Sequence, residues 1–129
     1  MTTFLLDTHV FIWMDISPTK LTPSVAALLT DRSNTLLLSV VSVWEMQIKL
    51  QLGKLQLEQS LTDMVKVQQQ TNHIQILPVT LPHVLALQDL PMHHKDPFDR
   101  LLTAQVMVEN ATLVSSDDIL TKYPVNVLW

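Results

Sequence analysis

Acidic side chains recur along this 129-residue chain at positions from which they could jointly bind a divalent cation. Each stands just after a short apolar run or near the start of a predicted helix: Asp7, Glu45, Asp99, Asp117 and Asp118. Carboxylate oxygens are hard ligands that suit Mg²⁺ and, as an alternative, Mn²⁺. An ion held by them lowers the pKa of a coordinated water and stabilises negative charge on a phosphate. Whether these acids meet depends on the elements that carry them.

The segment HHKDPFDRLL, residues 93–102, shows how little one acid proves by itself. Asp96 has the position of a helix N-cap, Pro97 that of the first helical residue, and Asp99 that of the N3 acid of a capping box. A solvated cap therefore explains each acid taken singly, and a second box of the same kind begins at Ser60. We predict that Asp96 only caps its helix, while Asp99 both completes the box and faces a cation.

Apolar runs and capping signals divide the chain into alternating strands and helices. Strands are predicted at 2–6, 35–40, 74–79, 111–115 and 125–129. Helices are predicted at 8–14, 22–31, 42–55, 60–71, 81–90 and 99–110, with a helical turn or two at 117–123. In the 42–55 helix, Ser42 and Glu45 are expected to form a capping box, and Gly53 stands near the end.

The predicted strands are continuously apolar, which indicates burial on both faces. The predicted fold class is therefore α/β, a three-layer sandwich with a mainly parallel central sheet of about five strands, built by a single domain of residues 1–129. The carboxyl ends of parallel strands share one edge, where right-handed crossovers keep them. The 99–110 helix leads into a strand, so its start belongs at the same edge. The sequence thus predicts carboxylates from four segments at one edge.

Converging carboxylates repel one another strongly enough to require a partner of opposite charge. Two of them ~4 Å apart repel by about 4 kcal/mol at an effective dielectric constant of ~20. A helix N-terminus offsets only about 0.3–1 kcal/mol for each. Three or four acids in one place therefore favour a bound cation.

Composition narrows the possible classes of protein. The net charge of −4 argues against a protein that binds nucleic acid through its overall charge, and 47% apolar residues argue against disorder. The absence of cysteine excludes disulfides and thiolate sites, and it fits a cytoplasmic protein. No apolar run approaches ~18 residues, and the first residues lack a basic region. We therefore expect neither a membrane span nor a signal peptide.

Four motifs in order resemble those of PIN-domain ribonucleases, of the VapC-like kind that are toxins of type II toxin–antitoxin pairs. The motifs are LLDTHVFIW, SVVSVWEMQIKLQLGKL, HHKDPFDRLLTAQ and TLVSSDDIL, and the resemblance runs from Phe4 to Trp129. It implies a PIN-like fold and Mg²⁺-dependent cleavage of single-stranded or structured RNA. It also implies inhibition by a tightly bound cognate antitoxin, and a homodimer.

The resemblance assigns roles to the acids that match its motifs. The metal-binding acids are matched by Asp7, Glu45 and Asp99, and a fourth, more variable acid is matched by Asp117. Asp118 could take the place of Asp117. Our mechanistic hypothesis is metal-assisted hydrolysis of a phosphodiester, with Asp7 and Asp99 as the main ligands. Glu45 and Asp117 would place this metal, a second metal or the attacking water.

Other positions of the motifs support the site or depart from the family pattern. Thr8 and Ser115 match small hydroxyl positions beside the acids, although threonine is usual where Ser115 stands. His9 occupies a place where many members have asparagine.

Basic and imidazole side chains near the third motif could contact the substrate. Arg100 and Lys95 either bind RNA phosphates or form a solvated, charge-balancing pair. His94 is expected on a loop at the mouth of the site, in reach of RNA. Adjacent histidines point in different directions on most backbones, so His93 and His94 do not predict a zinc site.

Other classes of function remain open on the sequence. A PIN-like module could bind RNA or a partner without cleaving. A Mg²⁺-binding signalling receiver domain is less favoured, because the middle strand lacks a terminal aspartate, and an Asp-x-Asp phosphatase fails because position 9 is His9. Trp13 and the apolar residues of the 42–55 helix belong either to the core or to a groove for an antitoxin helix.

Overall fold

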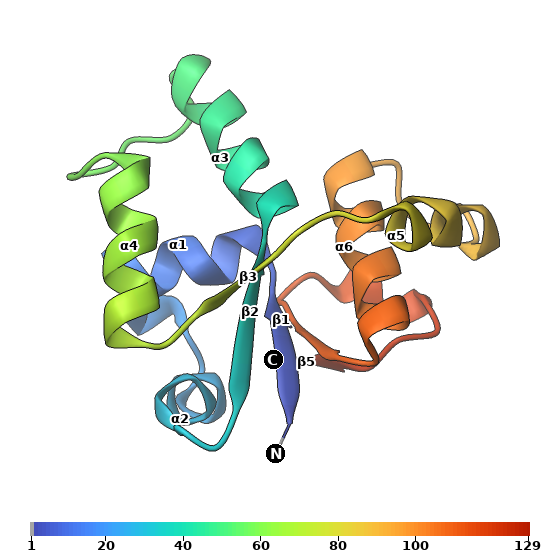
Figure 1. The fold of residues 1–129 in the computed structure, drawn as a ribbon, viewed down its shortest axis with the longest axis horizontal. Helices are drawn as coiled ribbons and strands as arrows, with labels where there is room; N and C mark the ends of the chain where they lie inside the picture. The colour runs from blue at the N-terminus through green and yellow to red at the C-terminus, as the bar shows by residue number, and fades with distance from the viewer. Residues whose placement is uncertain (1) are drawn as a thin grey trace.

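The computed structural model describes residues 2–129, in which five parallel strands form one sheet in the order β3-β2-β1-β4-β5 (Figure 1). The strands are β1 (Thr3–Leu6), β2 (Thr35–Ser39), β3 (Gln75–Leu77), β4 (Thr112–Val114) and β5 (Val127–Leu128). The α-helices are α1 (Thr8–Ile16), α2 (Pro23–Thr30), α3 (Val40–Gln51), α4 (Leu61–Thr71), α5 (Leu81–Ala86) and α6 (Pro97–Glu109). Short 3₁₀ helices are η1 (Pro18–Lys20), η2 (Leu87–Asp89) and η3 (Asp118–Lys122). The predicted α/β sandwich is confirmed, and every strand pair is parallel.

The sheet is apolar on both faces because successive residues of each strand point to opposite sides. In β1, Phe4 and Leu6 join one buried cluster with residues of α1, α2 and α4, whereas Leu5 joins another with residues of α6. Figure 1 views the sheet edge-on, with α1 and α4 on one side and α5 and α6 on the other. This double burial explains the unbroken apolar runs that identify the strands in the sequence.

Capping residues set the helix starts, and one of them differs from the prediction. Ser60 caps α4, as its capping-box sequence predicts, and Thr22 caps α2. The predicted capping box of Ser42 and Glu45 is wrong, because Ser39 caps α3 and accepts a hydrogen bond from the backbone N–H of Val41 at 3.0 Å. Strand β2 therefore passes directly into α3, and the side chains of Ser42 and Glu45 are buried inside the helix where they can support a site.

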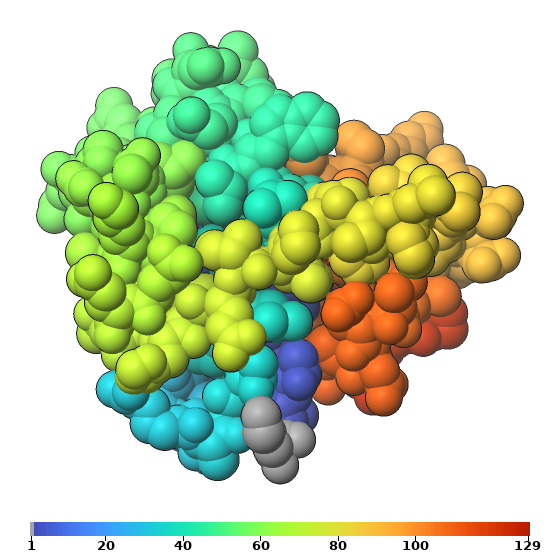
Figure 2. Space-filling model, in the orientation of Figure 1, coloured from blue at the N-terminus to red at the C-terminus, as the bar shows by residue number. Residues whose placement is uncertain are grey.

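The chain crosses from one helical layer to the other after β3. Figure 2 shows the segment from α4 through β3 to α5 lying across the visible face of the molecule. Helix α5 packs against α6, and the predicted 81–90 helix is divided into α5 and η2. Within residues 2–129, no helix has both the length and the hydropathy to cross a membrane.

Three large apolar side chains of α1 and α3, or at their ends, differ in how far they are exposed. Met46 is fully buried in α3, and Trp13 is half-buried against Trp129 with 5.7 Å between ring centroids. Leu52 is 62% exposed at the end of α3. Most apolar residues of α1 and α3 thus serve the core, but Trp44 within α3 is 59% exposed.

The carboxyl ends of β1, β2 and β4 lie at one edge of the sheet. Helices α1 and α3 begin there, directly after β1 and β2. Figure 1 shows α6 also beginning at this end and running back beside the sheet before β4. The predicted meeting of several segments at this edge is therefore present in the fold.

Candidate metal centre

Asp7 is the buried acid at the centre of this edge. It is the N-cap position of α1, and its backbone N–H extends the sheet by donating to the carbonyl of Val114 at 3.0 Å. One carboxylate oxygen, Oδ2, accepts a hydrogen bond from the hydroxyl of Ser115 at 2.7 Å. The Ser115 hydroxyl also accepts the backbone N–H of Asp117 at 3.1 Å. One serine therefore joins the ends of β1 and β4.

Glu45 is buried on α3 and is held from two sides. Its Oε1 accepts a hydrogen bond from the hydroxyl of Thr8 at 2.8 Å, and Ser42 lies 2.9 Å from the same hydroxyl. Its Oε2 pairs with the Nζ of Lys49 at 2.9 Å, one helical turn further on. Glu45 therefore keeps a fixed orientation beside Asp7, the neighbour of Thr8.

Asp99 lies in the first turn of α6, where Asp96 forms the cap. The Oδ1 of Asp96 accepts the backbone N–H groups of Phe98 and Asp99, at 2.9 and 3.2 Å, so the predicted cap is present. The prediction that the carboxylate of Asp99 completes a reciprocal capping box is wrong. Its Oδ2 instead lies 2.8 Å from Nε2 of His94, because the preceding loop folds back over the helix start.

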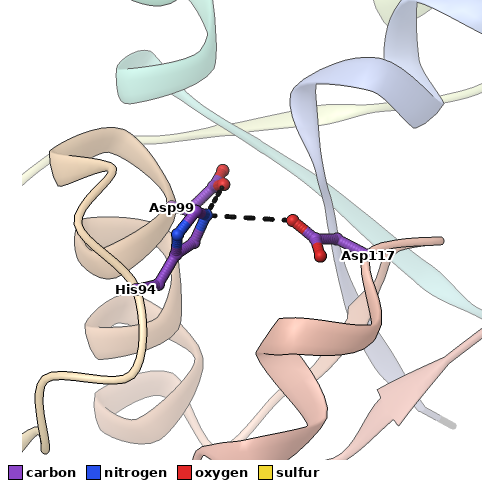
Figure 3. A group of neighbouring side chains, drawn as sticks. All are labelled: His94, Asp99 and Asp117. Carbon is purple, nitrogen blue, oxygen red and sulfur yellow. Dashed lines mark hydrogen bonds and ion pairs between the residues drawn. The ribbon is translucent and has the colours of Figure 1, made fainter.

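Asp117 brings a further carboxylate to the same place from the segment after β4. Figure 3 shows His94, Asp99 and Asp117 converging from the loop before α6, from α6 and from the start of η3. One donor atom of each lies within 4.8 Å of the others, with His94 Nε2 3.8 Å from Asp117 Oδ2. Asp118 is exposed and stands outside this group within the described residues.

Burial and crowding of negative charge make the two central acids hard to ionise. Burial raises the pKa of Asp7, and the nearby charge of Glu45 raises it further, against the hydrogen bond from Ser115 that lowers it. Burial, together with the charges of Asp7, Asp96 and Glu45, raises the pKa of Asp99 to about 7, against the His94 hydrogen bond that lowers it. These shared effects place Asp7, Glu45 and Asp99 in one electrostatic environment.

A divalent cation fits this donor set. Asp7 Oδ1 is buried without a hydrogen-bond partner, although a buried carboxylate oxygen ordinarily has one. An ion beside it would complete its coordination and offset the charge that Asp7, Glu45 and Asp99 concentrate here. The donors available around it are carboxylate oxygens, with one imidazole nitrogen, and hard cations such as Mg²⁺ and Mn²⁺ accept such ligands.

The three residues predicted to bind substrate lie in different surroundings. Arg100 donates to the carbonyl of Pro91 at 2.9 Å and lies 3.3 Å from the hydroxyl of Tyr123, so its guanidinium braces the loop. Lys95 is exposed on that loop beside the site. His94 lies inside the acidic group, deeper than a position at the mouth.

Three supporting side chains escaped the sequence reasoning. Lys49 stands at i+4 from Glu45, a spacing that signals an ion pair on a helix. The sequence pattern predicts Ser42 as a helix cap, and its contact with Thr8 is therefore not expected. Tyr123 accepts the backbone N–H of His94 at 2.9 Å across 29 residues, which no local pattern could indicate.

Comparisons with known proteins agree with this fold. A family model described as PIN domain matches residues 4–126. No curated protein matches the chain. Among solved structures, the chain is similar to VapBC2 from Rickettsia felis bound to a DNA fragment from the promoter, with a TM-score of 0.76 and 16% identity over 98% of both chains.

Two further solved structures extend this likeness. DNA-bound VapBC from Salmonella typhimurium has a TM-score of 0.66 and 13% identity, over 99% of this chain and 98% of that chain. FitAcB from Neisseria gonorrhoeae has a TM-score of 0.64 and 18% identity, over 98% of this chain and 96% of that chain. At such low identity these structures show a shared fold.

Proposed function

The chain belongs to the PIN-domain family, and we propose that it is a metal-dependent endoribonuclease that acts as the toxin of a toxin–antitoxin pair. PIN domains are generally nucleases, which supports a hydrolase of phosphodiester bonds. The observation that carries the proposal is that the charges of Asp7 and Glu45 act on Asp99, that Asp117 lies beside Asp99, and that Asp7 has a buried carboxylate oxygen without a hydrogen-bond partner. The match to residues 4–126 supports treating 1–129 as one nuclease domain.

In this proposal the acids divide the work of holding Mg²⁺ or Mn²⁺. Asp7 and Asp99 are the main ligands, because burial leaves their charge most in need of a cation. Glu45 and Asp117 lie beside them and orient the ion, a second ion or the attacking water. The bound cation would supply a water of lowered pKa and would stabilise the negative charge of the phosphate.

The surrounding side chains keep the acids in place for RNA hydrolysis. Ser115 fixes the carboxylate of Asp7 through one hydrogen bond, and Thr8 fixes that of Glu45. Asp96 holds the start of α6, and through it the position of Asp99. Such positioning matters because ligands must be held rigidly for a metal centre to act.

We infer the partner class from the relatives. The similar solved structures include VapBC complexes that align over nearly the whole chain, which supports a small antitoxin as partner. A homodimer that works in the cytoplasm fits the same class of protein. Large apolar side chains exposed on this chain offer surface for such contacts: Trp44, Leu81, Val84, Leu85 and Met92.

Cleavage of RNA by purified protein tests the proposal. With Mg²⁺ or Mn²⁺ and a mixed pool of single-stranded and structured RNA, we expect discrete fragments that EDTA abolishes. Asp99→Asn should slow cleavage by at least ~100-fold, because the loss of a metal ligand removes several kcal/mol of transition-state stabilisation. Added product of a small neighbouring reading frame should inhibit the parent protein.

Asp63→Asn is the matched control for this assay. Asp63 occupies the same N3 position of α4 that Asp99 occupies in α6, behind an equivalent cap at Ser60. It should cleave like the parent protein. If Asp99→Asn also cleaves like the parent with Mg²⁺, the role proposed for Asp99 is wrong.

A PIN-like module that binds without cleaving is the alternative. It would retain RNA or a partner protein but release no fragments with either cation. The intact set of acids favours the enzyme. Membership of the PIN family removes the receiver-domain alternative.

A further inference from the structure

A histidine takes part in the group of side chains that surrounds the proposed cation. His94 Nε2 lies 2.8 Å from Asp99 Oδ2 and 3.8 Å from Asp117 Oδ2 (Figure 3). These two distances are compatible with shared ligands of one ion. Two ligand atoms that are each ~2.1 Å from an octahedral ion lie about 3 Å apart when adjacent and about 4.2 Å apart when opposite.

Contacts outside this group hold His94 in position. Its backbone N–H donates to the hydroxyl of Tyr123, which is only 3% exposed, at 2.9 Å. Arg100 donates to the same hydroxyl and to the carbonyl of Pro91, so it links the start of the loop to Tyr123. These contacts hold the loop so that the imidazole faces the acids. Side chains that bind metals are commonly held in place by such surrounding contacts.

An independent observation points to a ligand that is missing from these contacts. Asp7 Oδ1 is buried and has no hydrogen-bond partner, while Asp7 Oδ2 is joined through Ser115 to the backbone of Asp117. The unpartnered oxygen therefore belongs to the same connected set as the group around His94. Within the described residues, this set offers carboxylate oxygens together with one imidazole nitrogen.

We propose that His94 binds the divalent cation through Nε2, together with Asp99 and Asp117, so that the site prefers Mn²⁺ to Mg²⁺. The inference rests on the proposed metal-dependent function and makes its cation more specific. Mg²⁺ is bound mostly through oxygen, whereas an imidazole nitrogen suits transition metals. The alternative is that His94 only donates a hydrogen bond to Asp99 and leaves the cation to the acids.

Electron paramagnetic resonance of protein loaded with Mn²⁺ distinguishes these two roles. A nitrogen bound to Mn²⁺ modulates the electron spin echo at the frequency of ¹⁴N. We expect this modulation in the parent protein and in His93→Asn, and its loss in His94→Asn. His93 is the matched control, because its ring packs against Tyr123 with 5.3 Å between centroids.

The affinities for the two metals give a second measurement. Titration of metal-free protein should show that His94→Asn binds Mn²⁺ about tenfold or more weakly than the parent protein, by analogy with the loss of other groups that support metal sites. Its affinity for Mg²⁺ should change less. His93→Asn should match the parent protein for both ions.

The outcomes separate this inference from the proposed function. Mn²⁺ bound by the parent protein without ¹⁴N modulation, or modulation retained in His94→Asn, overturns the role of His94, while RNA cleavage by the parent still supports a nuclease. If Mn²⁺ does not bind, this inference fails, and the proposed function fails as well only if Mg²⁺ does not bind either. If His94→Asn does not fold, parent protein labelled with ¹⁵N-histidine decides, because the ¹⁴N signal must then disappear.

Discussion

At the scale of single residues, Asp99 is a carboxylate that its surroundings disfavour in the charged form. Its side chain is 14% exposed and lies within electrostatic reach of Asp7 and Glu45. Burial and these charges raise its pKa to about 7, from an ordinary value of 3.8. A residue that served only as a solvated cap would not be placed in this way. Ionised Asp99 therefore calls for a cation beside it.

This raised pKa predicts how the stability of metal-free protein depends on pH. Between pH 3.8 and about 7, folded Asp99 binds more proton than the unfolded chain does, so this group lowers the free energy of unfolding as the pH rises. Denaturant titrations in EDTA should show a loss on the order of 1 kcal/mol from pH 5.5 to 8.5 that Asp99→Asn lacks. Added Mg²⁺ should restore stability mainly at the higher pH. An identical pH dependence in parent and variant would contradict the raised pKa.

The sequence predicts the acids of the site better than the groups that hold them. Each acid follows a strand end or lies in the first two turns of a helix, so topology is enough to bring it near one edge. The positions of His94 and Tyr123 cannot be predicted in this way, because the 91–96 loop has no periodic pattern and is held by a hydroxyl 29 residues further on. The partner of Asp99 was missed for the same reason, and a box with Asp96 was expected in its place.

At the scale of elements, helix starts determine where the acids point. Strand β2 and helix α3 meet at Ser39 without a loop. The sequence alone does not predict this junction, because Ser39 and Ser42 are both plausible caps. The fold selects Ser39, since Val41 and Met46 are then buried. Glu45 consequently lies beyond the first turn of α3, where Thr8 can reach it.

The start of α6 gives a prediction about Asp96. Asp96→Asn keeps an oxygen that can accept the N–H groups of the first turn, so it should fold and cleave RNA nearly as the parent does. Asp96→Ala loses the cap and should lower the free energy of unfolding by about 1 kcal/mol. Thermal denaturation and the RNA assay measure both effects. A large loss of cleavage in Asp96→Asn at unchanged stability would show that Asp96 acts on the cation itself.

At the scale of the whole molecule, the central sheet joins the two helical layers. The fold class is predictable because burial on both faces leaves runs such as LLLSV with no polar alternation. The ends of β3 and β5 are less predictable, because the sequence stays apolar beyond the residues that pair in the sheet. The strands there are shorter than the sequence suggests.

This architecture predicts a sharp contrast between two leucines. Leu5 is fully buried in β1, whereas Leu52 is 62% exposed at the end of α3. Leu5→Ala should lower the free energy of unfolding by about 2–5 kcal/mol, because it leaves a cavity in the middle layer. Leu52→Ala should change it by less than ~0.5 kcal/mol. Urea denaturation of both variants measures the difference, and similar losses would contradict the burial of β1.

The hydrogen bond between Ser115 and Asp7 has a consequence for synthesis on the ribosome. The two residues are 108 positions apart, and they become neighbours only when β4 pairs with β1. A nascent chain that has not yet emerged beyond residue 117 therefore lacks part of its ion pocket. The acidic group can therefore form only after segments from both ends of this chain have been synthesised and paired.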